Sequence, residues 1–210
     1  MSSNKRKIAE IMATFNHTVH PSYIYWITIS RRNASMNRSI SPWQWLGFGF
    51  TSLGGTLLHF LYDWSGKSLW IAPFSGVNES TWEHMKLLYF SMFIYALIQS
   101  RFFSVRKDFW GVKLAGMITG LTAIPILFYT YNGALGTSPD WINIAIFFLA
   151  AAASYLVESA LFRKQSLQCN MPGIALAVLC VIGAAFVLFT FLPPQIPLFE
   201  DPLSGTYGIQ

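Results

Sequence analysis

Charged residues are scarce in this sequence of 210 residues. Only 11% are Asp, Glu, Lys or Arg, whereas 53% are hydrophobic and 17% are aromatic. A soluble domain carries about 25% charged residues, so roughly half of the charge that a water-exposed surface needs is missing. The shortage argues against a soluble globular protein and favours a chain whose outer surface faces lipid.

Cysteine is nearly absent as well. Cys169 and Cys180 would lie about 16 Å apart on a helix, which is too far for a disulfide, so we expect two free thiols.

The excess of basic residues is not gathered into one patch, because the net charge of +5 comes from short basic clusters between apolar runs. That arrangement is typical of membrane topology signals, and we expect no nucleic-acid partner.

Five apolar stretches are long enough to cross a bilayer, which takes about 20 residues. They cover residues 43–62, 85–103, 110–129, 141–162 and 173–192. We therefore expect an all-α integral membrane bundle of five transmembrane helices over residues 43–192. A cytoplasmic or interfacial segment, 1–42, precedes this bundle, and an extracytoplasmic tail, 193–210, follows it.

Lysine and arginine predict the orientation of these helices. One side of the bundle carries only Lys67, whereas the N-terminal segment and the alternate loops are basic. The basic set is Lys5, Arg6, Lys7, Arg31, Arg32, Arg38, Arg101, Arg106, Lys107, Arg163 and Lys164. The positive-inside rule makes the chain a multi-pass protein of the cell membrane, with its N-terminus in the cytoplasm and its C-terminus outside.

The segment 8–30 is more ambiguous than the five stretches. It mixes apolar residues with His17, His20 and Pro21, which fits an amphipathic helix lying in the inner interface. The alternative is a sixth span, which would place the basic residues 5–7 outside. Within the bundle, Gly116 and Gly120 predict close helix packing, and Lys113 is expected to pair with Glu158.

Ionisable side chains gather where the first stretch ends and the second begins. His59 and Asp63 are four residues apart and share one face of a helix. Glu79, Glu83 and His84 lie at the start of the next helix, on the same side of the membrane. Because a short connection makes the two helices antiparallel neighbours, we expect these residues to meet in one pocket.

Histidine and carboxylate groups are ligands that suit Zn²⁺, Mn²⁺ or Fe²⁺. The predicted metal ligands are His59, Asp63, Glu83 and His84. Glu79 or Asp201 is the predicted general base beside metal-bound water.

A purely structural interpretation remains open for the same residues. Ser80 and Glu83 fit a capping box, with Ser80 as the N-cap and Glu83 folding back onto it. Asp63 can pair with Lys86 or Lys67, and a histidine can hydrogen-bond a neighbouring helix.

The tail that follows the last stretch contains four of the ten prolines, so a helix is excluded there. Its apolar residues, Ile196, Leu198 and Phe199, predict a segment that folds over the mouth of the bundle like a lid. Such a lid would bring Asp201 and Tyr207 towards the pocket. The alternative is a disordered end.

Three motifs resemble an uncharacterised family of small bacterial membrane proteins, the domain of unknown function 6512. They are residues 55–66 (GTLLHFLYDWSG), 77–87 (VNESTWEHMKL) and 197–208 (PLFEDPLSGTYG), and the resemblance runs from about residue 43 to the end. It implies a membrane bundle and no activity. His59 and Asp63 also resemble the His-x-x-x-Asp pair of intramembrane hydrolases such as alkaline ceramidases, although the seven spans and the later His-x-x-x-His of those proteins are missing.

Three kinds of function fit these observations. The first is a metal-dependent membrane enzyme that acts on a lipid-like substrate at the outer face. The second is a protein that binds or transports a cation or small solute. The third is an accessory subunit that docks a partner membrane protein. The first predicts bound metal that is lost when the histidines are removed.

Overall fold

The regular structure of this protein is helical. The computed structural model describes residues 21–103, 106–136, 140–164 and 172–209. In these ranges it contains five helices and no strand, which confirms the all-α prediction. The helices are α2 (Pro21–Trp64), α3 (Thr81–Ser100), α4 (Phe109–Leu135), α5 (Asp140–Lys164) and α6 (Pro172–Phe191).

The chain divides into two units, residues 1–40 and 41–210. In the first unit the described residues, 21–40, are helical and form the beginning of α2. The helix therefore begins well before residue 43, where the first apolar stretch was expected to start. The predicted interfacial helix at 8–30 lies in part outside the described residues.

Three helices in the described part of the chain are long and apolar enough to cross a membrane, fewer than the five predicted. They are Phe109–Leu135, Trp141–Lys164 and Gly173–Phe191. The apolarity of α3 is reduced by Glu83, Lys86 and Gln99, all of which are buried. Polar groups that face the protein interior lower the mean hydropathy of a helix without facing lipid.

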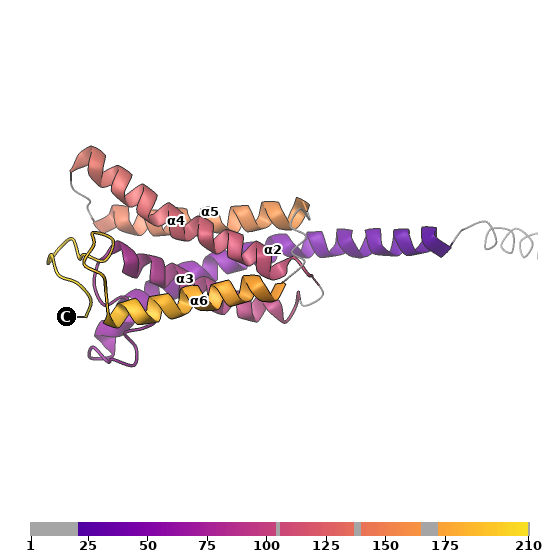
Figure 1. Cartoon of the computed structure of the whole chain (residues 1–210). Helices are drawn as coiled ribbons and strands as arrows, with labels where there is room; N and C mark the ends of the chain where they lie inside the picture. The colour runs from indigo at the N-terminus through magenta and orange to yellow at the C-terminus, as the bar shows by residue number, and fades with distance from the viewer. Residues whose placement is uncertain (1–20, 104–105, 137–139, 165–171, 210) are drawn as a thin grey trace, which may run out of the picture. The chain divides into compact units, whose positions relative to one another are not determined.

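The second unit is a bundle in which α4 packs chiefly against α5 (Figure 1). Gly116 and Gly120 allow this close approach, as predicted. A Cβ atom added at Gly116 would collide with Cγ of Glu158, and one at Gly120 would collide with Oγ of Ser154. The predicted pair between Lys113 and Glu158 is confirmed, with an N–O distance of 2.5 Å.

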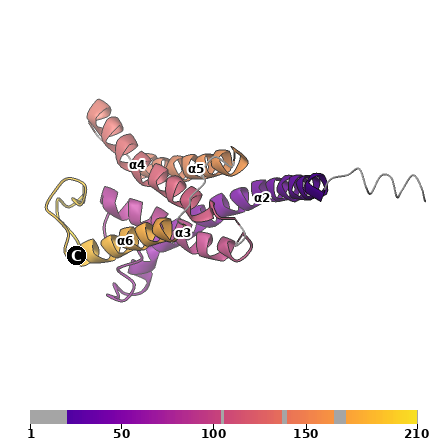
Figure 2. The same cartoon turned by 45° about the vertical axis from the view of Figure 1, so that its right-hand side comes forward.

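One end of the bundle carries both the α2–α3 loop, residues 65–80, and the tail after α6 (Figures 1 and 2). Two hydrogen bonds join the tail to the end of this loop and the start of α3. The N–H of Trp82 donates to the carbonyl of Leu198 at 3.0 Å, and Nδ2 of Asn78 donates to the carbonyl of Gly208 at 2.9 Å. The rings of Trp82 and Phe199 lie 4.5 Å apart, so apolar contact supports these bonds.

Candidate metal centre

Two imidazoles and one carboxylate converge at this end of the bundle. His59 comes from the last turns of α2, Glu79 from the loop and His84 from the first turn of α3. Nε2 of His59 lies 3.4 Å from Oε1 of Glu79, and Nε2 of His84 lies 3.7 Å from Oε2 of the same residue. One ligand atom from each residue lies within 4.8 Å of the other two. We call these three residues the His–Glu cluster.

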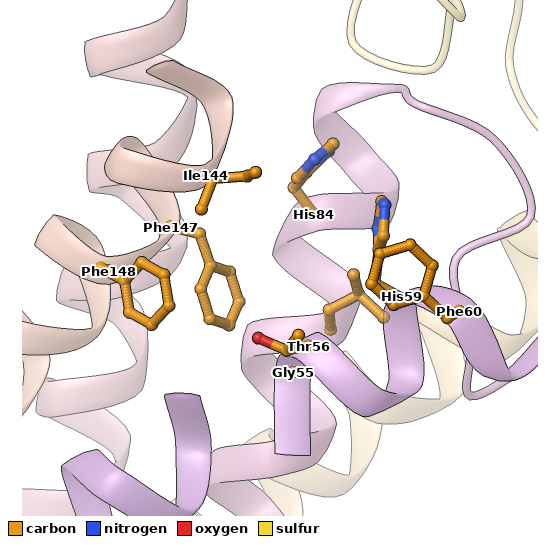
Figure 3. Close-up of a pocket in the computed structure, with 9 residues that line it drawn as sticks. Gly55, Thr56, His59, Phe60, His84, Ile144, Phe147 and Phe148 are labelled. Carbon is orange, nitrogen blue, oxygen red and sulfur yellow. The ribbon is translucent and has the colours of Figure 1, made fainter. Parts of the chain in front are cut away.

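These separations suit a metal ion. With metal–ligand bonds of about 2.1 Å, two ligands of a tetrahedral ion lie about 3.4 Å apart. The two histidine–glutamate distances, 3.4 and 3.7 Å, are close to that value. The two imidazole rings, with centroids 5.8 Å apart, lie near each other in Figure 3.

A hydrogen bond to the ring nitrogen that faces away from the cluster fixes the orientation of His84. Its Nδ1 lies 3.0 Å from the backbone carbonyl of Ser80. Because a carbonyl only accepts, Nδ1 carries the hydrogen and Nε2 presents its lone pair to the cluster. Metal-binding histidines commonly donate their second ring N–H in this way. Burial lowers the pKa of His84 below its ordinary value, which favours the neutral form that binds metal.

Glu79 is held between two anchored neighbours. The Asn78 side chain accepts a hydrogen bond from the N–H of Ser80 at 3.0 Å, which forms a local turn around Glu79. Ser80 in turn is the N-cap of α3, because its Oγ accepts from the N–H of Glu83 at 3.3 Å. The carboxylate of Glu79 therefore projects from a turn whose two ends are fixed.

The part of the loop that precedes Glu79 is tied to α2 beside His59. Oγ of Ser75 accepts from the N–H of Tyr62 at 2.8 Å and donates to the carbonyl of Leu58. The N–H of Gly76 also donates to the Leu58 carbonyl, at 3.3 Å. The loop thus bonds to one carbonyl and one amide group in the last turns of α2, and it brings Glu79 back over His59.

Glu83, a predicted ligand, lies outside the His–Glu cluster. Its carboxylate is buried, pairs with Lys86 at 2.5 Å and accepts from the N–H of Val77 at 3.0 Å. Nζ of Lys86 also donates to the carbonyl of Ala72 and to Oγ1 of Thr190. Ser80 is the N-cap as predicted, but Glu83 reaches back to Val77 instead of to Ser80.

Asp63 and Asp201 are also placed away from the cluster. Asp63 is exposed near the end of α2. Asp201 is buried in the tail, where its carboxylate accepts from the N–H of Leu203 and from Oγ of Ser204, both at 2.9 Å. Of the six residues predicted to form the site, the structure therefore brings together His59, Glu79 and His84.

Sequence reasoning overlooked two interactions in and beside the cluster. The carbonyl of Ser80 orients His84, and a backbone group leaves no signal in the sequence. The pairing of Lys86 with Glu83 was readable from their spacing, because residues three apart on a helix are neighbours.

A family model described as Family of unknown function (DUF6512) matches residues 32–209. The chain belongs to this family. The match confirms the resemblance noted in the sequence and begins earlier than the expected residue 43. No curated protein and no solved structure matches the chain. The function of this DUF6512 protein must therefore be argued from its own geometry.

An apolar pocket opens beside the His–Glu cluster in this DUF6512 protein. It has a volume of about 110 Å³ and lies between α2, α3 and α5. His59 and His84 form its polar side, while Ile144, Phe147 and Phe148 of α5 face them across the space (Figure 3). A polar centre thus adjoins a hydrophobic space inside the bundle.

Proposed function

We propose that this DUF6512 protein is a five-span membrane protein that holds a divalent metal ion at the His–Glu cluster and uses it on a lipid-like substrate. The observation that carries the proposal is the convergence of His59, Glu79 and His84 from three segments, with His84 oriented by a carbonyl. Zn²⁺, Mn²⁺ and Fe²⁺ all suit two imidazoles and one carboxylate.

The surface of α2 and α3 supports membrane spans in addition to those of α4, α5 and α6. On α2, Leu53 and Leu57 are exposed, and on α3 so are Ile94, Leu97 and Ile98. Exposed apolar rows on helices that bury their polar groups fit a lipid environment. The distribution of Lys and Arg then gives a cytoplasmic N-terminus and an extracytoplasmic cluster.

A metal held by three protein ligands keeps coordination positions open for water or substrate. Such an ion polarises a carbonyl or phosphoryl oxygen and lowers the pKa of bound water to about 7. The protein's own part is to present the two imidazoles, to add the carboxylate of Glu79 and to leave one side of the site open. All three ligands are half-buried and none is fully enclosed, which leaves that side accessible.

The adjoining pocket favours an amphiphile as the substrate. A polar headgroup at the metal would place an apolar chain between Phe60 of α2 and Phe147 of α5, where burial is worth about 0.8 kcal/mol per methylene. A small hydrophilic solute would gain nothing from this apolar wall.

Elemental analysis of the purified protein tests the metal site. We expect near-stoichiometric Zn, Mn or Fe in the wild type and its loss in His59→Ala/His84→Ala. The matched control is His17→Ala/His20→Ala, which removes the other two of the four histidines and should keep the metal. A well-folded wild type that takes up no metal contradicts the proposal and leaves an accessory subunit as the better interpretation.

Chain-length dependence tests the substrate class. Alkyl hydroxamates bind metal ions through their headgroup, so a Co²⁺-loaded sample should change its visible spectrum when one binds. We expect tighter binding of dodecanohydroxamate than of acetohydroxamate, and Ile144→Trp should remove that preference while the metal stays bound. Equal affinity for both chain lengths would favour a site for a cation or small solute.

A further inference from the structure

A second and larger cavity lies between α2 and α5 and shares no residue with the pocket beside the His–Glu cluster. It has a volume of about 450 Å³. Ser41, Gln44 and Phe48 line it on α2, and Leu156, Ser159 and Arg163 line it on α5. These residues recur at helical spacing, so the cavity is a groove that follows one face of each helix.

The groove changes in character along its length. Ser41 and Gln44 on α2, with Ser159 and Arg163 on α5, contribute its polar groups. Phe48 lies about 10 Å further along α2 than Ser41, at 1.5 Å per residue, and that part of the lining is apolar. A polar end that leads into an apolar channel matches the shape of an amphiphile.

The polar end offers hydrogen-bond donors and a positive charge. Arg163 is exposed, and among the described residues it takes part in none of the ion pairs. Gln44 is 4% exposed and lies beside Glu158, yet neither of its amide atoms makes a well-formed hydrogen bond. The charge of Glu158 is already matched by Lys113, so it leaves the positive charge of Arg163 uncancelled.

We propose that this groove binds one anionic phospholipid, with its phosphate at Arg163 and Ser159 and an acyl chain along Phe48 and Leu156. Charge complementarity selects the headgroup, and the apolar part of the groove selects a chain in place of a free anion. Basic pockets between membrane helices on the cytoplasmic side commonly hold such headgroups. The inference rests on the membrane placement proposed above and is independent of the metal.

Spin-labelled lipids test the groove in the full-length protein, reconstituted in phosphatidylcholine bilayers. One cation near the membrane surface is worth about 1 kcal/mol, or about fivefold in affinity. We therefore expect the protein to immobilise spin-labelled phosphatidylglycerol about fivefold more strongly than spin-labelled phosphatidylcholine. Arg163→Gln should abolish this preference, while the control Lys164→Gln, which removes the neighbouring charge, should keep it.

The apolar part of the groove has its own variant. Leu156→Trp fills the channel and should release the immobilised phosphatidylglycerol, with the metal content unchanged. Equal losses in Arg163→Gln and Lys164→Gln would overturn the inference, since the preference would then belong to a general basic rim. Immobilised lipid without any headgroup preference would overturn it too. Absence of immobilised lipid in every sample would instead contradict the membrane placement itself.

Discussion

The His–Glu cluster and the pair between Lys113 and Glu158 are built from similar ionisable groups but in opposite ways. In the pair, both side chains are buried and their charges meet at 2.5 Å. In the cluster, one half-exposed carboxylate lies between two imidazoles at 3.4 and 3.7 Å. The two charges of the pair neutralise each other, whereas the cluster retains ligand atoms for a further cation. Burial and charge balance therefore separate a structural pair from a candidate site.

The largest effect is expected from breaking the pair. Lys113→Met leaves Glu158 charged and unpaired in the bundle, which costs about 3–5 kcal/mol. For a chain of this size the unfolding temperature should fall by roughly 6–20 °C. Thermal unfolding in detergent, followed by tryptophan fluorescence, measures it. Lys113→Met/Glu158→Leu should recover most of the loss, and a single variant as stable as the wild type would refute the structural role.

The opposite behaviour is expected at the cluster. Glu79→Gln should leave the unfolding temperature nearly unchanged because the side chain is half exposed. It should weaken Zn²⁺ binding by more than about 100-fold, since loss of an outer-shell partner alone costs about 10–100-fold. Competition against a zinc-sensitive dye gives the affinity. Unaltered binding would exclude Glu79 as a ligand.

Acidity should weaken metal binding at the cluster. Protons compete with the metal for Nε2 of His84, whose pKa burial holds below its ordinary value of 6.5. Zn²⁺ affinity should therefore be nearly constant between pH 8 and pH 7 and fall as the pH is lowered towards 5 and below. The same dye competition at several pH values measures the fall. A pH-independent affinity would show that neutral histidines are not the ligands.

The smallest effect is expected at Asp63. This side chain is exposed at the end of α2, so Asp63→Asn should change the free energy of unfolding by less than about 0.5 kcal/mol. Zn²⁺ affinity should also remain within about twofold of the wild type, because no ligand is removed. A large loss of metal in this variant would restore the ligand set that the sequence predicts, in which Asp63 pairs with His59.

Much of the fold could be predicted because apolar runs report on helices directly. The fourth stretch, predicted at 141–162, corresponds to Asp140–Lys164, and the fifth, predicted at 173–192, to Pro172–Phe191. The second stretch was predicted at 85–103 as a membrane span, but α3 is not among the helices that are apolar enough to cross a membrane. Mean hydropathy averages over all sides of a helix, so it does not reveal that Glu83 and Lys86 face inwards.

The site was predicted in part for a related reason. His59, Glu79 and His84 were recognised as neighbours because a short loop joins their helices. Glu83 was added because it precedes His84, but consecutive residues on a helix point about 100° apart. Only one of the two can face His59, and the other meets the loop and Lys86. Glu79 precedes the helix and is free of that restriction.

The bonds from Asn78 and Trp82 to the tail have a consequence for the order of assembly during synthesis. The start of α3 is made more than a hundred residues before Leu198 and Gly208, which satisfy its donors. Until the ribosome has released that later stretch, the N–H of Trp82 and the amide of Asn78 lack their final partners. The turn that carries Glu79 is therefore closed by a segment made long after it, so this end of the bundle is finished only after α4, α5 and α6 have been made.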